Sequence, residues 1–346
     1  MKLAKLDAMN LETAAAELSW KNFRMKQVQH ARETELVTSW DAITTLAKND
    51  RDFLNEHVPF DILQEEKKET SSDKTAVKWL LTAANGESIE TVLLLHTGGK
   101  KKWGTVCVSS QIGCAMACQF CATGQMKLTR NLTTDEILDQ FLIAKREAAK
   151  RGIVGNLNVV FMGMGEPCLN LPAVIPTIKT LTDPNRHGLA ASRITVSSSG
   201  IVPGMADLRA AALGISFALS LHAPNDQLRT RLMPINKQFP LAEVLAEIKK
   251  WQHGGAEVLI EYILIAGVND QPEHAHELIE ILHGQRVKVN LIPLNPIPDT
   301  DLQRPARDAM MHFLYELESA GMRAMLRHTK GDDIAAACGQ LKTKSA

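Results

Sequence analysis

The sequence predicts an α/β protein built around a partial (β/α)6-type barrel. From about residue 104 onward, strand-like segments alternate with segments of helical character, which is typical of βαβ units and a parallel sheet. Six or more such units follow one another, enough for a partial or full barrel. Polar residues recur where the predicted strands end, and barrels of this class place their active sites there. We therefore expect a polar pocket at one end of a barrel.

The chain of 346 residues divides into four expected parts. They are a small helical N-terminal accessory domain (1–55), a short β-containing connector (56–103), the barrel (104–330) and a C-terminal tail (331–346).

Residues 1–55 have a helical character. Residues 10–18 and 25–32 consist largely of strong helix formers, and apolar residues recur at roughly helical spacing between residues 39 and 54. A modest basic patch contains Lys21, Arg24, Lys26 and Arg32. It could be an ordinary solvated face or a surface that holds RNA phosphates, and both interpretations remain open.

The connector contains two predicted strands, residues 76–82 and 89–95, which the turn sequence Asn85-Gly86 joins. A basic loop, residues 98–102, follows the second strand.

The barrel elements follow in regular order. Thr133 and Glu136 have the spacing of a capping box, so a helix should begin there and end near Gly152. The other elements are assigned from runs of strand-forming or helix-forming residues. The expected strands are 105–110, 158–162, 193–198, 215–221, 258–265, 287–293 and 323–328. The expected helices are 134–151, 171–181, 205–213, 241–252, 272–282 and 305–320.

The polar strand ends define the expected pocket. They are residues 163–167, 197–200, 220–223, 293–296 and 327–329. Glu166 could hold a cationic amine, and the neighbouring glycines allow close approach of the backbone to a ligand. This Gly-Met-Gly-Glu sequence matches a dinucleotide-binding fingerprint poorly. His222 could instead be a structural histidine, and Asn295 could simply cap a turn before Pro296.

Three of the six cysteines, Cys114, Cys118 and Cys121, follow the first barrel strand with the spacing C-x3-C-x2-C. Their thiolates are soft ligands for iron–sulfur clusters or zinc. A structural zinc ion would need a fourth ligand, for which Cys107 and His187 are the nearest candidates. A 4Fe-4S cluster fits better, because three cysteines leave one iron open to a small molecule. The remaining interpretation is three buried, unliganded cysteines.

The composition argues against a membrane-spanning protein and against a secreted one. Hydrophobic residues make up 45% and charged residues 23% of the chain, as in ordinary globular proteins. No apolar run approaches 18 residues, so we expect no membrane span, and residues 1–7 lack the apolar core of a signal peptide. A metal-type cysteine cluster then favours the reducing cytoplasm. The net charge of zero means that any RNA contact must come from local patches.

Five further motifs help to choose among the interpretations of the cysteine cluster. They are residues 107–114 (CVSSQIGC), 120–124 (FCATG), 162–167 (MGMGEP), 220–225 (SLHAPN) and 332–341 (DDIAAACGQL). Together with the cysteine triad they resemble the RlmN/Cfr family of radical S-adenosylmethionine (SAM) methyltransferases, and they are closer to the RlmN branch. The resemblance covers residues 75–346 well and the first 55 residues more loosely. It implies a radical SAM barrel and methylation of an adenine ring carbon in RNA.

The resemblance also implies roles for individual residues. Cys114, Cys118 and Cys121 would hold one 4Fe-4S cluster. Cys338 would carry the methyl group as S-methylcysteine, and Cys107 would later form a disulfide with it. Glu90 matches a proposed proton acceptor. The positions that match SAM-binding residues are Gly165, Glu166, Ser197, Ser220, Leu221, His222 and Asn295. Cys168 is expected to be a buried thiol without a role.

The implied substrate is carbon-2 of an adenine in 23S rRNA, with tRNA as a further candidate. The implied partners are RNA and an external one-electron reductant of the flavodoxin or ferredoxin type, and we expect a monomer. Three alternatives remain. They are carbon-8 methylation as in the Cfr branch, a radical SAM enzyme acting on another RNA, a small molecule or a protein, and a non-catalytic iron–sulfur or zinc protein.

Overall fold

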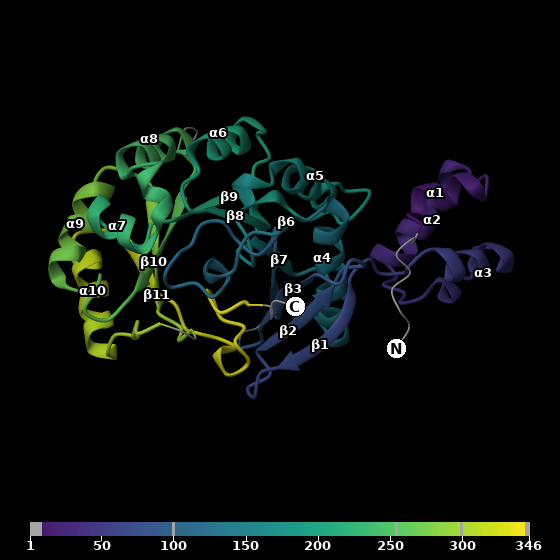
Figure 1. Ribbon diagram of the computed structural model, residues 1–346, viewed down its shortest axis with the longest axis horizontal. Helices are drawn as coiled ribbons and strands as arrows, with labels where there is room; N and C mark the ends of the chain where they lie inside the picture. Colours follow the sequence, from purple (N-terminus) through teal and green to yellow (C-terminus); the bar gives the residue numbers. More distant parts are fainter. Residues whose placement is uncertain (1–8, 99–100, 253–254, 298–299, 343–346) are drawn as a thin grey trace.

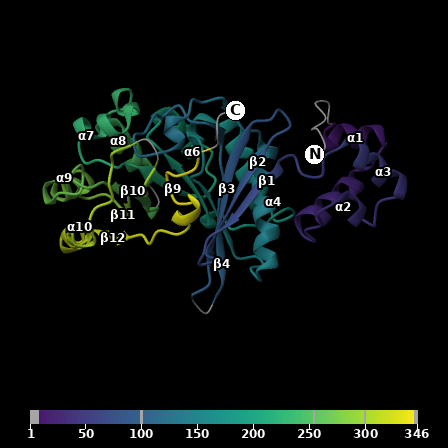
Figure 2. The same cartoon turned by 60° about the horizontal axis from the view of Figure 1, so that its bottom comes forward.

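The computed structural model describes residues 9–98, 101–252, 255–297 and 300–342. Its N-terminal helices lie to one side of a large sheet whose outer face is covered by helices (Figures 1 and 2). The N-terminal helices pack around a hydrophobic cluster of their own, which includes Trp40 and Leu54. They are α1 (Leu11–Glu17), α2 (Asn22–Glu33), the 3-10 helix η1 (Trp40–Ala42) and α3 (Lys48–His57). The helical pattern expected over 39–54 is therefore split, with the β-branched Thr44 and Thr45 at the interruption.

One ten-stranded sheet contains both the connector strands and the barrel strands. Strands β1 to β4 pair antiparallel, and from β4 to β12 the strands are parallel. Their order is β1-β2-β3-β4-β7-β8-β9-β10-β11-β12. Their bounds are β1 Gln64–Thr70, β2 Ala76–Thr82, β3 Ser88–His96, β4 Trp103–Cys107, β7 Leu157–Phe161, β8 Ile194–Ser198, β9 Ser216–Ser220, β10 Val258–Leu264, β11 Val287–Pro293 and β12 Arg323–Leu326.

The predicted helices of the barrel are present. The capping box at the start of α4 is confirmed, because the Thr133 hydroxyl accepts from the Glu136 amide and the Glu136 carboxylate accepts from the Thr133 amide. The helices are α4 Thr134–Lys150, α5 Leu171–Thr182, α6 Val202–Ala210, α7 Asp226–Leu232, α8 Leu241–Trp251, α9 Pro272–Leu282 and α10 Arg307–Ser319. The short helix α7 and a small hairpin, β5 Gln111–Ile112 with β6 Arg130–Asn131, were not predicted.

The strand expected over 105–110 ends earlier than predicted. Strand β4 stops at Cys107, and the next backbone amides turn to other partners. The Ser109 amide donates to Gln140 Oε1 at 2.8 Å, and the Ser110 amide donates to the Met164 carbonyl at 2.8 Å. The chain thereby leaves the sheet directly before the cysteines.

The parallel strands form a barrel that the sheet itself does not close, because β1 and β12 are the two ends of the strand order. The C-terminal tail lies across this opening. Lys330 Nζ donates to the Leu95 carbonyl at 2.9 Å, and the Lys342 amide donates to Glu90 Oε2 at 2.7 Å. The predicted fold class, a partial radical SAM-type barrel with a helical N-terminal region, is confirmed. No helix among the described residues is long and apolar enough to cross a membrane.

Candidate active site

The cysteine loop, residues 114–121, lies at the C-terminal end of the barrel strands. Glycines fold it tightly. A Cβ on Gly124 would lie 2.7 Å from the Cys118 carbonyl oxygen, and one on Gly113 would lie 1.9 Å from the Lys127 carbonyl oxygen. The Gln119 amide donates to the Leu232 carbonyl at 3.0 Å. The loop is thus folded tightly on itself and anchored to the end of α7 directly after Cys118.

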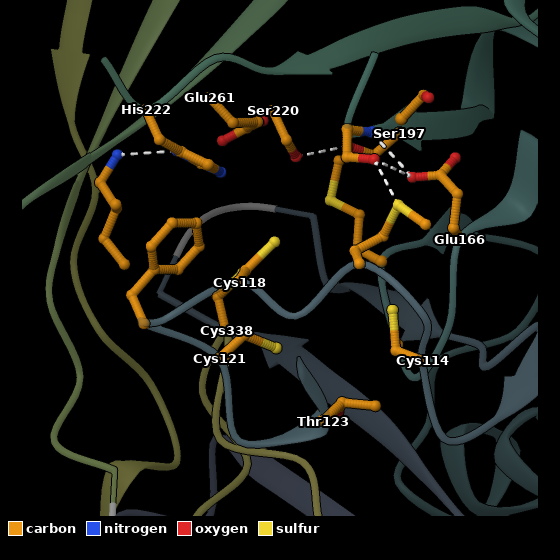
Figure 3. A pocket seen from close by; sticks show the side chains of 18 of the residues that line it. Cys114, Cys118, Cys121, Thr123, Glu166, Ser197, Ser220, His222, Glu261 and Cys338 are labelled. Carbon is orange, nitrogen blue, oxygen red and sulfur yellow. Dashed lines mark hydrogen bonds between the residues drawn. The ribbon is translucent and has the colours of Figure 1, made fainter. Parts of the chain in front are cut away.

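A single pocket contains most of the predicted site residues (Figure 3). Its empty volume is about 970 Å³. The predicted residues that line it are Cys114, Cys118, Cys121, Gly165, Glu166, Ser197, Ser220, His222 and Cys338. They come from the cysteine loop, from three strand ends and from the tail, so segments far apart in the sequence meet here.

The thiols of the cysteine loop are strongly desolvated. Burial, together with the neighbouring Cys121 and Glu166, raises the pKa of Cys114 to about 12. Burial also raises the pKa of Cys118 and Cys121, and for Cys118 the other two thiols add to the effect. All three thiols are therefore protonated at neutral pH unless a bound cation compensates their charge.

Glu166 is buried beneath the pocket and its carboxylate is held on several sides. Oε2 accepts from the amide and the hydroxyl of Ser199, each at 2.8 Å, and Oε1 accepts from the Cys168 amide at 3.0 Å. Burial raises its pKa, which these hydrogen bonds oppose. Gly165 has a φ of 98°, and a Cβ there would lie 2.5 Å from Gln111 Cβ, so only glycine fits.

His222 follows β9 in a left-handed conformation, with a φ of 60°. Its Nδ1 accepts from the Ile263 amide at 3.1 Å, and its carbonyl accepts from Asn269 Nδ2 at 2.9 Å. Burial, followed by the charge of Arg229, lowers its pKa to about 3. The ring is therefore neutral and carries its proton on Nε2. Nearby, the hydroxyls of Ser197 and Ser220 lie 3.2 Å apart.

Two predicted residues frame the pocket without lining it. Leu221 is fully buried, and its carbonyl accepts from Arg229 Nε at 3.2 Å. Asn295 Nδ2 donates to the Cys338 carbonyl at 3.0 Å, and its Oδ1 accepts from Arg304 Nη2 at 3.0 Å. In this structure Asn295 therefore holds the backbone that carries Cys338.

Cys338 faces the pocket from the tail. Its side chain is exposed to the cavity but is surrounded by protein atoms. Desolvation, followed by the charge of Glu261, raises its pKa to about 11. The Ala122 amide donates to the Gly339 carbonyl at 2.7 Å, which ties the tail to the end of the cysteine loop. Cys107 lies at the end of β4, outside the lining of the pocket, and its pKa is raised to about 12, mainly by burial and then by the charge of Cys338.

Glu90 lies on β3, outside the lining of the pocket. Its Oε1 is 2.9 Å from Lys78 Nζ, and its Oε2 accepts from the Lys342 amide. Burial raises its pKa, and Lys78 opposes this shift. The structure thus places Glu90 where it holds the end of the tail.

Sequence reasoning missed two buried residues at this site. Glu261, on β10, lines the pocket, and its Oε2 has no hydrogen-bond partner among the described residues, although Arg327 Nη1 lies 3.9 Å away. Arg229, on α7, is fully buried and donates to the carbonyls of Ser199 and Leu221. A charged residue within an apolar strand was the available signal for Glu261, whereas α7 itself was not predicted.

The cysteines suit a cluster better than a single ion. Within the described ranges, no three His, Cys, Asp or Glu side chains converge on the position of one metal ion. Instead, the three thiols are spread along one wall of the pocket (Figure 3), as a multinuclear cluster requires. The free space beside them is bordered by a carboxylate and two hydroxyls. This donor set fits the ammonium and hydroxyl groups of SAM.

The comparisons with known proteins agree with this geometry. The sequence profile of the radical SAM superfamily matches residues 108–279. The chain is 42% identical to the dual-specificity RNA methyltransferase RlmN of Marinobacter nauticus, over 99% of this chain and 91% of that protein. It is 41% identical to the protein of the same name from Alkalilimnicola ehrlichii, over 99% and 94%.

A solved structure is similar over the same extent. The crystal structure of a radical SAM methyltransferase from Sphaerobacter thermophilus superposes with a TM-score of 0.90, at 40% identity over 96% of each chain. The similarity thus includes the cysteine loop, the polar strand ends and the cysteine-bearing tail. The chain belongs to the RlmN family of radical SAM RNA methyltransferases.

Proposed function

We propose that this protein transfers a carbon unit derived from the methyl group of SAM to carbon-2 of an adenine in 23S rRNA, and also in tRNA. One observation carries the proposal. Cys338 lines the same pocket as the three cysteines of the cysteine loop, although it lies far from them in the sequence. A radical SAM enzyme that used no protein thiol as a carrier would not need this arrangement.

The cofactor site follows from the pocket. Cys114, Cys118 and Cys121 hold a 4Fe-4S cluster, and Glu166 binds the amino group of SAM. Gly165, Ser197, Ser220 and His222 contact the remainder of SAM, while Leu221 and Asn295 shape that side of the site. When bound, the cluster and SAM together supply one-electron chemistry that can break an unactivated C–H bond. This chemistry is needed because the adenine carbon is not a nucleophile.

The two outlying cysteines carry and release the carbon unit. The Cys338 sulfur accepts the methyl group and presents it to the base inside the pocket. After losing one hydrogen, the sulfur-bound carbon bonds to the adenine carbon, which gives up its own proton, so that the base is linked to Cys338. Cys107 then attacks the Cys338 sulfur: an S–S bond forms, the bond from that sulfur to the carbon breaks, and the methylated base is free. Asn295 Nδ2 and the Ala122 amide hold the carbonyls of Cys338 and Gly339, and so fix the backbone of the carrier. Glu90 holds the tail through the Lys342 amide in this conformation, so its role as the proton acceptor requires that contact to open.

The partners follow from the chemistry. The target adenine must leave its stack to reach a buried pocket. Electrons come from an external carrier of the flavodoxin or ferredoxin type. We expect a monomer that works in the reducing cytoplasm, where the thiols and the cluster persist.

The test is an anaerobic reaction of the cluster-loaded protein with SAM and unmodified RNA, followed by mass spectrometry of the nucleosides. We expect 2-methyladenosine from the wild type and none from Cys338→Ala. Cys168→Ala, which removes a buried thiol outside the pocket lining, should retain activity. Finding 8-methyladenosine would move the target to carbon-8. Unchanged turnover in Cys338→Ala would refute the two-cysteine mechanism.

A further inference from the structure

An aromatic pair lies at the edge of the sheet where strand β3 ends and strand β4 begins. His96 closes β3 and pairs in register with Trp103, which opens β4. The two rings are stacked, with centroids 3.5 Å apart and planes 4° from parallel. Trp103 remains 36% exposed, which is unusual for a residue of this size. These ends of β3 and β4 lie at the lower edge of the view in Figure 2.

Cations surround the pair. Lys330 Nζ lies 3.2 Å from His96 Nδ1. Burial, followed by the charges of Lys330 and Arg327, lowers the pKa of His96 to about 4, so the ring is neutral and both cations face it. Lys101 and Lys102 directly precede Trp103 and are exposed, whereas Lys100 of the predicted basic loop lies outside the described residues.

The neighbouring acids are already engaged by the fold. Asp73 accepts from the Ser71 hydroxyl at 2.7 Å and from the Thr75 amide at 2.9 Å. Asp333 accepts from the Ser72 amide at 2.7 Å. Among the described residues, neither carboxylate forms an ion pair with Lys101 or Lys102, so both lysines keep their attraction for an anionic partner.

One short segment of the chain connects the aromatic pair with the active-site pocket. Arg327 lines the pocket together with Cys338, yet its side chain is 46% exposed, which places it at the rim. Three residues further along, Lys330 Nζ lies 3.2 Å from His96 Nδ1. Three residues span at most about 11 Å, so the part of a ligand that stays outside Arg327 lies within reach of the aromatic pair.

We propose that Trp103 and His96 form a stacking platform for an unpaired RNA base next to the target adenine, with Lys101 and Lys102 holding the flanking phosphates. The proposal rests on the proposed function and adds the surface that receives the RNA. Proteins recognise RNA largely through unpaired bases that stack on aromatic side chains. Such stacking needs a flat, exposed ring, whereas phosphates need nearby cations, and this surface supplies both.

The basic patch of the N-terminal helices suits this role less well. Arg32 donates to the Phe60 carbonyl at 2.8 Å and faces Asp61 and Asp139. Arg24 donates to Gln27 Oε1 and to the Thr45 carbonyl. Only Lys21 and Lys26 of that patch are exposed, and neither lies near the pocket residues named above.

The test is fluorescence anisotropy of a labelled RNA stem-loop that contains the target adenine, bound to the cluster-loaded full chain at several salt concentrations. Trp103→Ala should weaken binding about 10-fold, as expected for the loss of one stacked base, with no change in the salt dependence. Trp103→Phe should restore most of the affinity. Replacing Lys101 and Lys102 together by alanine should lower the slope of log affinity against log salt by roughly one.

Two controls separate stacking from misfolding. Tyr315→Ala removes another exposed aromatic, 64% exposed on α10, and should leave binding unchanged. In the wild type, an abasic nucleotide beside the target adenine should weaken binding as much as Trp103→Ala does. The two changes together should weaken binding no further than either alone. This comparison holds the protein fold constant and so does not depend on the stability of the variant.

The outcomes are distinct. If the wild type methylates the RNA but Trp103→Ala binds it as tightly as Tyr315→Ala does, the platform is wrong and the proposed function stands. If Trp103→Ala slows reduction by the electron carrier without changing RNA affinity, the surface receives the carrier and the proposal is wrong. If the wild type neither binds nor methylates RNA, the proposed function itself fails.

Discussion

Two regions of this protein bury polar and charged groups, and they differ in what these groups face. The first is the charged joint, Arg32, Asp61, Asp139 and Arg146, between the N-terminal helices and α4. There Arg146 Nη1 lies 2.7 Å from Asp61 Oδ2, and Arg32 Nη2 lies 3.7 Å from Asp139 Oδ1. The second is the pocket, where desolvated thiols raise one another's pKa and Glu261 Oε2 has no hydrogen-bond partner within the described part of the chain.

The difference indicates what each region is for. In the joint, opposite charges compensate one another within the protein, so the joint holds two parts of the chain together. In the pocket, thiols and carboxylates face a cavity, and the nearest cation, Arg327 Nη1, lies 3.9 Å from Glu261 Oε2, so burial of these groups costs stability in the free protein. A site of that kind persists when a ligand supplies the missing partners. The comparison predicts that substitutions in the joint change stability, whereas substitutions in the pocket change ligand binding and turnover.

The largest effect should follow the loss of one ligand thiol. Cys118→Ala should abolish iron retention and methylation, because two thiolates cannot replace three in holding a cluster. Iron and sulfide analysis, with the visible absorption of the anaerobically loaded protein, measures the loss. Cys168→Ala is the matched control, since Cys168 is buried but lies outside the cysteine loop. Equal iron content in both variants would show that the cysteine loop does not hold the cluster.

The sequence was sufficient for the barrel because its signals are local. Alternating strand and helix runs and the Thr133–Glu136 capping box each depend on a few neighbouring residues, and the structure confirms them. Strand β1, Gln64–Thr70, escaped individual assignment because its side chains are polar and mostly exposed. It exists because its backbone pairs with β2, and this pairing leaves no apolar pattern in the sequence.

The site was predictable in its chemistry but less so in its geometry. The spacing of the three cysteines indicated a cluster, and the strand ends indicated a pocket. Nothing in the sequence showed that Asn295 would hold the Cys338 carbonyl or that Glu90 would hold the Lys342 amide. Both contacts depend on how the tail crosses the open side of the barrel, and long-range backbone contacts of this kind have no local sequence pattern.

In the charged joint, Arg146→Ala should lower the free energy of unfolding by about 3 kcal/mol, the lower end of the range for breaking a buried ion pair. The lower end applies because the Asp61 side chain is 26% exposed and water compensates part of the loss. Denaturant titration measures the change. Arg151→Ala removes one of two cations from Glu147 on the same helix, and Lys68 Nζ remains 2.6 Å from that carboxylate, so the loss should cost less than about 1 kcal/mol. Equal costs would mean that the joint contributes no more than a surface pair.

The joint should also make stability depend on pH. Burial, followed by the charge of Asp61, raises the pKa of Asp139 to about 7, against about 4 in an unfolded chain. Between about pH 4 and pH 7, Asp139 therefore holds a proton in the folded protein that it has lost in the unfolded chain. The free energy of unfolding then falls as the pH rises from about 4 to 7, by at most about 1.4 kcal/mol per pH unit. Subtracting the profile of Asp139→Asn isolates this group from Arg32, Arg146 and Asp61. Identical profiles for both proteins would contradict the shift.

The smallest change in stability, with a large change in function, should come from Glu261→Gln in the pocket. The glutamine oxygen can still accept from Asn290 Nδ2, as Glu261 Oε1 does at 2.9 Å, and a buried charge disappears. We therefore expect the free energy of unfolding to stay the same or rise by about 1 kcal/mol, while the yield of methylated nucleoside falls.

Glu247→Gln is the matched control for that substitution. Glu247 is as deeply buried as Glu261, but Arg209 and Lys250 pair with its two oxygens at 2.9 Å each. Its loss should cost stability and leave turnover unchanged, the reverse of Glu261→Gln. Denaturant titration and nucleoside mass spectrometry on the same four samples (wild type, the two single variants and the double variant) measure both effects. A Glu261→Gln variant that lost as much stability as Glu247→Gln and kept its turnover would make Glu261 a structural group, like those of the charged joint. The reason is that a carboxylate kept for a ligand loses little in the free protein: glutamine retains the Asn290 contact, and Arg327 is already 3.9 Å away.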